Sequence, residues 1–592
     1  MLPCYAELHC LSNFTFLRGA SHPEELVERA AQLGYAALAI TDECSLAGVV
    51  RAYVAAQKTQ LKLIIGSEIQ LADGPRLVLL ATNHNGYGNL SELITQGRRA
   101  AIKGSYHLTR DDMAQGLADC LALLLPGEEA QLANMHWLRE LFPDRAWIAA
   151  ELTRGPNDAA YIMQLRALGK AANLPLVACG DVHMHLRARH ALQDAMTAIR
   201  LGIPVAELGL SLHPNGERHL RALGRLAHIY PADLLLESVN IAARCEFSLA
   251  ELRYEYPEEI VACGETPASY LRKLTYAGLK TRYPQGAAQN VLDMVEKELY
   301  LIAEMNYEPY FLTVYDIVAF ARGRDILCQG RGSAANSAVC FCLGITEVDP
   351  ARMQVLFERF ISKERNEPPD IDVDFEHERR EEVMQYVFTK YGRDRAAIVA
   401  AIHTYRPKGA LRDIGKALGF SLAQVDRLAK SMSWWDGRTI KHERLREAGF
   451  DPANPMVQRL LDLTHQLLGF PRHLSQHTGG FVIDRRRLSR LVPIENAAMN
   501  ERTVIQWDKD DLDALGLMKV DVLSLGMLSA IRCALDLINN YRGTQMRMVD
   551  IPADDGATYQ MIQHGDTIGV FQIESRAQMR DRKSTRLNSS HQ

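Results

Sequence analysis

SHPEELVERAAQLGYAALAITDE, residues 21–43, contains one complete helix-to-strand unit. A capping-box pattern at Ser21 predicts the start of a helix, whose apolar face ends at Gly34. The apolar run 35–40 follows at once and is typical of a buried parallel strand. Acidic residues come directly after that run, where polar groups of an α/β fold gather.

The same alternation recurs across the first 240 residues. Four further apolar runs have the length and composition of buried strands; they are 61–65, 76–81, 146–152 and 174–180. Helical patterns separate most of them, so the sequence predicts an α/β barrel or a doubly wound sheet with parallel strands.

Several of these runs are followed by side chains that can ligate metals. The candidate residues are His9, Asp42, Glu68, Asp181 and His183. One acidic residue at a strand end is usually a turn or cap residue. Five in equivalent positions predict the rim of an old metal site.

Composition restricts the class of protein. The 592 residues predict three to five domains, and 47% apolar with 23% charged residues is an ordinary globular balance. No apolar run is long enough for a membrane span and the start lacks a signal-peptide pattern, so we expect a cytoplasmic protein. The 11 cysteines form no C-x-x-C motif, which predicts reduced thiols rather than a disulfide framework or a zinc site.

Net charge gives only a local signal. The chain carries −5 overall, yet residues 401–480 hold 12 Lys and Arg against 7 Asp and Glu. This basic window is compatible with contacts to phosphates, and equally with a solvated helical surface.

The strongest chemical signal is IDVDF, residues 371–375. Side chains of a strand alternate between faces, so Asp372 and Asp374 share one face with their Cα atoms about 7 Å apart. Two carboxylates at this spacing can bridge a pair of divalent cations. A solvated edge strand is the alternative, and it leaves the preceding Pro-Pro and the nearby glycine loop unexplained.

A third carboxylate comes from 515–528, LGLMKVDVLSLGML, where Lys519 and Asp521 share a strand face. If this strand lies beside IDVDF, three aspartates meet with a lysine at their margin. Such an arrangement predicts two-metal nucleotidyl transfer.

A glycine-rich turn precedes both strands. Arg331, Gly332 and Ser333 lead into AANSAVCFCLG, which predicts a helix whose N-terminal N–H groups can receive a polyphosphate. The Walker lysine pattern is absent, which argues against a P-loop NTPase.

Two family resemblances follow from these motifs. ELHCLSNFTFLRGASHPEEL, AITDE, GSEI and GDVH resemble the polymerase and histidinol phosphatase (PHP) domain, a distorted α/β barrel that binds metal ions in its active members. Here Leu11, Glu43 and Arg76 stand where active members have histidines. Leucine cannot ligate and arginine brings a fixed positive charge, so the resemblance implies a vestigial rim.

The second resemblance covers residues 4–579. GRGSA, FERF, PDIDVDF, YGRD, HTGGFVI, QWDKDD, GLMKVDVLSLGML and TIGVFQIESRAQM, in this order, are similar to the catalytic α subunits of bacterial C-family DNA polymerases. The resemblance implies a palm like that of the polymerase β nucleotidyltransferases. It also implies that Asp372, Asp374 and Asp521 bind two Mg²⁺, with Mn²⁺ as an alternative, and that Arg331, Gly332, Ser333 and Lys519 contact the dNTP.

Within this family, QGRGSAANSAVCFCLGIT and AELHCLSNF look more like the error-prone, damage-inducible paralogues than the replicative subunits. This implies translesion synthesis and damage-induced mutagenesis on primer–template DNA. A sliding clamp and other mutagenesis factors are implied partners, through a C-terminal region beyond this chain. The segment 404–419 matches the thumb, where Arg406, Lys408 and Arg412 would contact DNA.

The expected domains follow these motifs. They are the PHP domain at 1–240, the palm at 241–403 and 478–528, the thumb at 404–477, the first part of the fingers at 529–580, and a tail at 581–592 that looks foreign to the family. Without the remaining fingers, we expect weak polymerase activity.

Three alternatives stay open at this point. The chain could belong to a replicative α subunit, it could act as a metal phosphoesterase through the PHP rim, or it could bind primer ends without catalysis. Trp434, Trp435, His473 and His477 carry no assignment, because each residue type is equally typical of a structural role.

Overall fold

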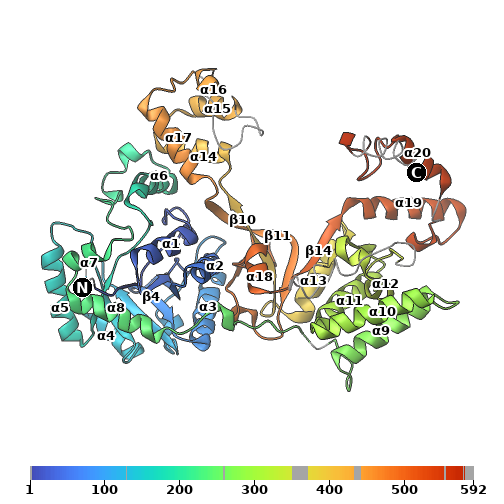
Figure 1. Ribbon diagram of the computed structural model, residues 1–592, viewed down its shortest axis with the longest axis horizontal. Coiled ribbons are helices and arrows are strands. Elements are labelled where there is room, and N and C mark those ends of the chain that lie inside the picture. Colours follow the sequence, from blue (N-terminus) through green and yellow to red (C-terminus); the bar gives the residue numbers. More distant parts are fainter. Residues whose placement is uncertain are drawn as a thin grey trace. The chain divides into compact units, whose positions relative to one another are not determined.

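The computed structural model describes residues 3–127, 130–257, 260–349, 371–431, 442–447, 449–551, 555–577 and 579 (Figure 1). The chain divides into two compact units. The first combines Met1–Tyr256 with Tyr391–Lys519, and the second combines Pro257–Lys390 with Val520–Gln592. FERF, Trp434, Trp435 and the tail 581–592 lie outside the described residues.

The N-terminal part of the first unit contains a seven-stranded sheet in sequence order. Its strands are β1 (Ala6–Glu7), β2 (Ala37–Ile40), β3 (Lys62–Gln70), β4 (Arg76–Ala81), β5 (Cys120–Leu125), β6 (Ala146–Glu151) and β7 (Leu176–Cys179). β4 pairs antiparallel with β3 and β5, and the other neighbours are parallel. The expectation of a parallel strand at 76–81 is therefore wrong, because the five residues 71–75 are too few for a crossover. β5 was not predicted.

The two edges of this sheet meet. The amide of Leu11 donates to the Val182 carbonyl at 2.8 Å, and the Val182 amide donates to the His9 carbonyl at 3.0 Å. These bonds nearly close the barrel, so the predicted α/β barrel is confirmed. They also bring the segments just beyond β1 and β7 together, which places His9 near Asp181.

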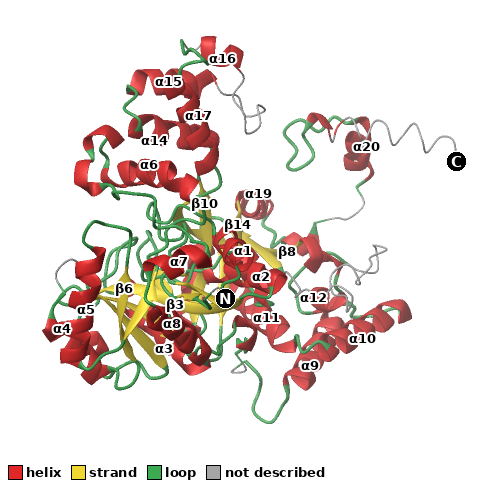
Figure 2. Ribbon diagram, turned by 60° about the vertical axis from the view of Figure 1, so that its left-hand side comes forward, coloured by secondary structure: helices red, strands yellow, loops and turns green. Residues whose placement is uncertain are grey.

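Helices surround the barrel (Figure 2). They are α1 (Pro23–Leu33), α2 (Val49–Thr59), α3 (His84–Arg99), α4 (Leu132–Leu141), α5 (Asp158–Ala172), α7 (Leu223–Ile229) and α8 (Ala232–Arg244), whereas α6 (His190–Leu201) lies away from the barrel. Strand β2 shows why its run is apolar throughout. Leu38 packs into the core shared with α1 and α2, whereas Ala39 packs into the core shared with α8.

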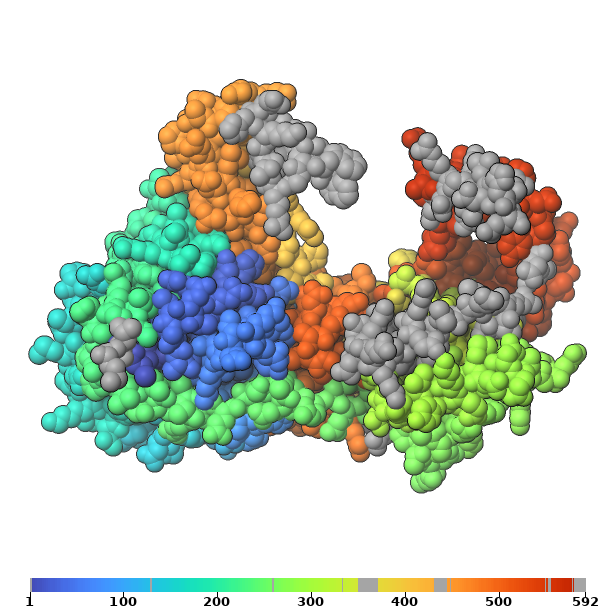
Figure 3. Space-filling view, viewed as in Figure 1, coloured from blue at the N-terminus to red at the C-terminus, as the bar shows by residue number. Residues whose placement is uncertain are grey.

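The rest of the first unit contains four neighbouring strands and a helical insertion. The strands β10 (Ala396–Thr404), β11 (Pro471–Ile483), β12 (Ile494–Asn496) and β13 (Thr503–Ile505) lie in the order β12-β13-β10-β11. Between β10 and β11 the chain forms α14 (Pro407–Ala417), α15 (Leu422–Ser431), α16 (His442–Glu447) and α17 (Pro455–Leu467), and α18 (Lys509–Leu515) follows β13. The insertion shares an apolar core with α6, and Figure 3 shows it (orange) above the teal residues of that region.

The second unit contains three paired strands and the helices around them. The strands are β8 (Cys328–Arg331), β9 (Asp372–Glu376) and β14 (Val520–Leu525), with β9 in the middle. The helices are α9 (Pro267–Arg282), α10 (Gln289–Glu304), α11 (Glu308–Gly323), α12 (Ala338–Cys342), α13 (Arg380–Tyr391), α19 (Gly526–Arg542) and α20 (Gly556–His564). Among the described residues, no helix has the length and apolar character needed to cross a membrane.

Candidate functional site

Three aspartates lie side by side in the second unit. β14 runs parallel to β9, and its register pairs Asp521 with Asp372 and Leu523 with Asp374. Residues paired in this way project on the same side of a sheet, so the three carboxylates share one face. The structure thus brings together the two segments that the sequence placed about 150 positions apart.

A guanidinium group faces these carboxylates from the third strand. β8 runs antiparallel to β9 and pairs Arg331 with Asp372. Nε of Arg331 lies 3.2 Å from Oδ2 of Asp374, and its Nη2 lies 3.9 Å from Oδ2 of Asp372. The Arg331 side chain is 50% exposed, so it can move away when another cation or an anion arrives.

Burial and charge act against each other at Asp374. Its pKa is raised, mainly because burial penalises the charged carboxylate, while Arg331 lowers the pKa and the neighbouring Asp372 raises it. Like charges next to each other on a sheet are unfavourable. Because every donor on this face is a carboxylate oxygen, the set fits hard divalent cations such as Mg²⁺ or Mn²⁺.

The backbone and the close packing of the glycine turn favour glycine. Gly332 has φ +62°, and a Cβ at Gly330 would lie 2.8 Å from the Ile345 carbonyl oxygen. The chain then forms a 3₁₀ turn, 332–336, before α12 begins at Ala338 with Ser337 as its N-cap. The side chain of Ser333 lies outside the described residues.

The first N–H groups of α12 are not free for the phosphate that was expected there. Glu298 of α10 is 2% exposed and accepts hydrogen bonds from the amides of Ala338 and Val339, both at 2.9 Å, and from the Ser337 hydroxyl at 2.8 Å. The protein's own carboxylate therefore takes the N–H groups that a phosphate was expected to meet. Burial raises the pKa of Glu298 to about 7, against the lowering effect of these three donors.

The remaining predicted contacts lie in the first unit. Lys519 is buried. Arg406 and Lys408 are exposed at the start of α14, and Nε of Arg412 lies 2.8 Å from Oδ1 of Asp426.

The two histidines without an assignment have local contacts. The ring of His473 stacks on that of His403, with 4.9 Å between centroids. Nδ1 of His477 accepts a hydrogen bond from the Gly480 amide at 2.8 Å. Both contacts are within strand β11 and its neighbour β10.

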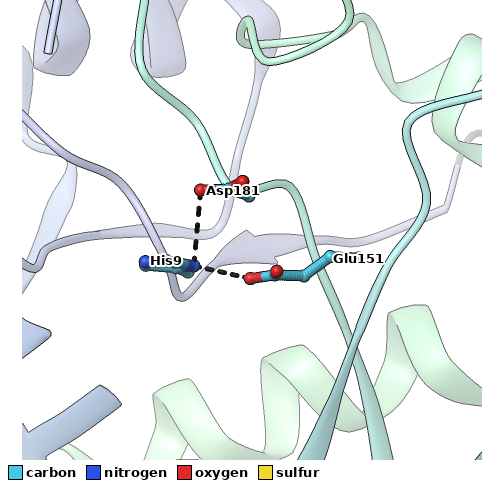
Figure 4. A group of neighbouring side chains, drawn as sticks. All are labelled: His9, Glu151 and Asp181. Carbon is cyan, nitrogen blue, oxygen red and sulfur yellow. Dashed lines mark hydrogen bonds and ion pairs between the residues drawn. The ribbon is translucent and has the colours of Figure 1, made fainter. Parts of the chain in front are cut away.

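A second cluster lies at the rim of the barrel (Figure 4). Nδ1 of His9 lies 2.6 Å from Glu151 Oε1 and 3.9 Å from Asp181 Oδ1. Each of these three residues offers one ligand atom within 4.8 Å of the others, so the group could hold a metal ion. Glu151 was missed by the sequence analysis, although it lies within the predicted strand 146–152 and is the last residue of β6.

Arginines reach the same rim. Nη1 of Arg18 lies 2.9 Å from Glu68 Oε1 and 2.5 Å from Glu43 Oε2. Nε of Arg218 lies 2.5 Å from Asp181 Oδ2. These guanidinium groups already balance much of the negative charge that would attract cations. Nε of Arg76 lies 3.7 Å from Glu68 Oε1.

Burial and ion pairing set the acid–base state of the rim. Burial alone would raise the pKa of Glu68, but His9 and Arg18 lower it to about 2. Burial lowers the pKa of His9, yet Glu151, Glu68 and Asp181 outweigh it and leave that pKa raised. Both residues are therefore held in their charged forms by each other.

Two other predicted rim residues have different surroundings. Asp42 accepts hydrogen bonds from the amides and hydroxyls of Ser12 and Thr15, at 2.6–3.1 Å, so it orders the loop after β1. It lies outside the group of His9, Glu151 and Asp181. Nε2 of His183 is hydrogen-bonded to Asp181 at 2.8 Å, and burial lowers the pKa of His183.

Comparison with known proteins agrees with this geometry. Three family models match: the PHP domain at residues 7–153, the bacterial DNA polymerase III alpha NTPase domain at 269–524, and the finger domain of the same subunit at 527–589. The NTPase match contains β8, β9 and nearly all of β14. These matches make the chain similar to the bacterial DNA polymerase III alpha family.

Curated relatives of the family cover nearly the whole chain. It is 63% identical over 583 residues to an error-prone DNA polymerase of Dechloromonas aromatica, covering 98% of this chain and 57% of the relative. Proteins of the same name match at 62% identity in Pseudomonas aeruginosa, covering 98% and 56%, and at 61% in Methylococcus capsulatus, covering 97% and 55%. The chain thus spans about half the length of these relatives.

Proposed function

We propose that this chain carries the nucleotidyl-transfer centre of an error-prone DNA-directed DNA polymerase. The observation that carries the proposal is the parallel register of β9 and β14, which sets Asp521 beside Asp372 and next to Asp374. The name shared by relatives at about 60% identity supports the subtype. A replicative α subunit is the alternative, and the mutation spectrum of the products separates the two.

The residues of this centre would have different roles in the reaction. Asp372, Asp374 and Asp521 would hold two Mg²⁺ ions, which when bound lower the pKa of the primer 3′-hydroxyl and stabilise charge on the transferred phosphoryl group. Arg331 would exchange Asp374 for the dNTP triphosphate, because its half-exposed side chain can turn to a stronger anion. Gly332 supplies the left-handed backbone that the turn after Arg331 requires.

The substrates and partners follow from this assignment. Primer–template DNA and dNTPs are the substrates, and Lys519 with Ser333 would complete the triphosphate contacts. The exposed Arg406 and Lys408 of α14 would contact DNA phosphates, joined by Arg412 once it leaves Asp426. We also propose a cytoplasmic location, a role in damage-induced translesion synthesis, and a sliding clamp and mutagenesis factors as partners.

Primer extension tests the proposal. The wild-type chain, Asp374→Asn and the control Asp293→Asn are each joined to the C-terminal part of the D. aromatica relative and given labelled primer–template, dNTPs and Mg²⁺. Asp293 is an exposed carboxylate of α10 that accepts from Gln289 at 2.8 Å, so it matches the charge change at another place in the same unit. We expect incorporation to fall by roughly 10³-fold in Asp374→Asn and to stay unchanged in Asp293→Asn. Equal incorporation by all three proteins would refute the proposal, and DNA binding without incorporation by the wild type would favour a non-catalytic binder.

One observation bears on a second function, metal-dependent phosphoester hydrolysis at the barrel rim. His9, Glu151 and Asp181 border a cavity of about 330 Å³ and could hold an ion for phosphoester hydrolysis. We expect no such activity, because Arg18 and Arg218 supply the positive charge at this rim. Mn²⁺-dependent release of phosphate from p-nitrophenyl phosphate that survives Asp372→Ala and is lost in His9→Ala would establish it.

A further inference from the structure

A second large cavity, of about 720 Å³, lies within the first unit. Its walls come from the loop after β1, the segment after α3, the end of α6 and the first residues of β11. Cavities of this volume accept ligands of nucleotide size. None of its lining residues belongs to the aspartate cluster or to the trio of His9, Glu151 and Asp181.

The cavity is electropositive in a chain whose net charge is −5. Two carboxylates, Glu43 and Glu495, line it together with five cations: Arg18, Arg98, Lys103, Arg200 and Arg472. Arg18 is paired with Glu43, and Nζ of Lys103 lies 3.3 Å from Glu495 Oε1. Arg472 lies 3.5 Å from Asp413 of α14, which leaves Arg98 and Arg200 as the cavity-wall arginines without a carboxylate partner among the described residues.

Arg98 is held in place by neutral acceptors. Its Nε donates to the Cys44 carbonyl at 2.9 Å and its Nη2 donates to the Glu43 carbonyl at 3.0 Å. The guanidinium carbon lies 5.4 Å from the centroid of the Tyr106 ring. Backbone carbonyls fix the geometry without neutralising the charge, so Arg98 is a preorganised anion receptor.

Arg200 adds a second positive charge at the end of α6. Its pKa is lowered, mainly by partial burial and further by the charge of Arg18, while Glu43 raises it. Within the described residues, neither Arg98 nor Arg200 forms a salt bridge. An anion in the cavity would relieve the repulsion between these groups.

Aromatic rings lie beside the cations. Phe16 is half-buried in the cavity wall, and Tyr106 lies under Arg98. Aromatic faces next to guanidinium groups are the usual platform for a nucleobase attached to a phosphate. We propose that this cavity is a second nucleotide site, which binds the phosphate of a nucleoside monophosphate or of the end of a single DNA strand. The proposal goes beyond the polymerase function and does not depend on it.

Isothermal titration with dAMP in the presence of EDTA tests this site, since EDTA removes the cations that the aspartates would need. The test variants are Arg200→Gln, which changes an exposed side chain, and the pair Arg98→Gln/Arg200→Gln. The control variant Arg166→Gln also removes one positive charge, but from α5, where the Arg166 side chain is 48% exposed and paired with Asp233. Arg331→Gln removes the guanidinium that faces the aspartates.

We expect dAMP affinity to fall about threefold or more in Arg200→Gln and at least tenfold in the double variant, with inorganic phosphate as a competitor and deoxyadenosine not bound. Arg166→Gln and Arg331→Gln should bind dAMP like the wild type. The proposal fails if the wild type does not bind dAMP, if Arg166→Gln loses as much affinity as the double variant, or if Arg331→Gln abolishes binding. A 5′-phosphorylated dT₈ that binds more tightly than dAMP and than unphosphorylated dT₈ would identify a strand end as the source; the reverse order would identify a free nucleotide.

Discussion

We predict that Glu298 makes the stability of the segment after the glycine turn depend on pH. Its carboxylate is almost fully buried and accepts three hydrogen bonds at the start of α12. Burial raises its pKa from the usual 4.5 to about 7. The folded unit therefore binds a proton more tightly than the unfolded chain does, so Glu298 favours folding below pH 4.5, and this advantage is lost as pH rises to about 7.

The magnitude follows from the shift of about 2.5 pH units. At about 1.4 kcal/mol per unit, the free energy of unfolding should fall by about 3 kcal/mol between pH 4.5 and 7 because of this group alone. Glu298→Gln cannot titrate, so it removes that slope. It keeps one acceptor for Ser337 and Val339 but turns an amide donor toward the Ala338 amide, which costs about 1–2 kcal/mol at low pH.

Hydrogen exchange of the Ala338 and Val339 amides measures this effect directly. We expect their protection in the wild type to decrease from pH 5 to 7.5, after correction for the intrinsic exchange rate, and to stay flat in Glu298→Gln. Glu304→Gln, at the end of the same helix, should keep the wild-type slope. If Glu298→Gln shows the same slope as the wild type, the carboxylate does not titrate at this position and the reasoning is refuted.

Three further predictions concern the barrel and the turn. Arg18→Met removes the guanidinium group that is hydrogen-bonded to the fully buried Glu68 and should lower the free energy of unfolding by about 3 kcal/mol in urea titrations, against less than 1 kcal/mol for Arg166→Met; equal effects would contradict the buried pairing. The pKa of Glu68, lowered to about 2, gives stability that is complete above pH 4.5 and lost as pH falls toward 2, so acid unfolding of the barrel should shift to higher pH in Arg18→Met, as far-UV circular dichroism would reveal. Gly332→Ala forces a side chain into φ +62° and should cost about 1 kcal/mol in thermal unfolding, whereas Gly323→Ala, with nothing within 4 Å of a new Cβ, should be neutral or slightly stabilising.

The sequence alone could predict the positions of side chains that follow from the two-residue alternation of a strand. Alternation in IDVDF placed Asp372 and Asp374 on one face, and the apolar residues of 518–522 identified the strand that carries Asp521. The barrel followed from buried runs that end in polar residues. These patterns involve only neighbouring residues, and the geometry of a strand determines directly on which face each side chain lies.

The sequence could not show which side chains from distant positions bind the free N–H groups of α12 and the carboxylates of the barrel rim. The first turn of α12 looked like a phosphate cradle until Glu298, about 40 positions earlier, was found to occupy it. The rim looked like a depleted metal site, and only the closed barrel brought Arg18 and Arg218 to its acids. In both cases a tertiary contact replaces a ligand that local pattern had predicted.

The two acidic clusters differ in how their negative charge is balanced, and this difference separates their expected chemistry. At the barrel rim, Glu68 is fully buried and held by Arg18, so a metal ion would have to displace a guanidinium group and leave it in a poorly solvated place. On β9 and β14, Arg331 faces the aspartates but is half-exposed, and leaving them only returns it to water or to an incoming triphosphate. Cation binding at the aspartates is therefore the less costly exchange, although both clusters contain enough carboxylates. For this reason the three aspartates, rather than the barrel rim, carry the proposed reaction.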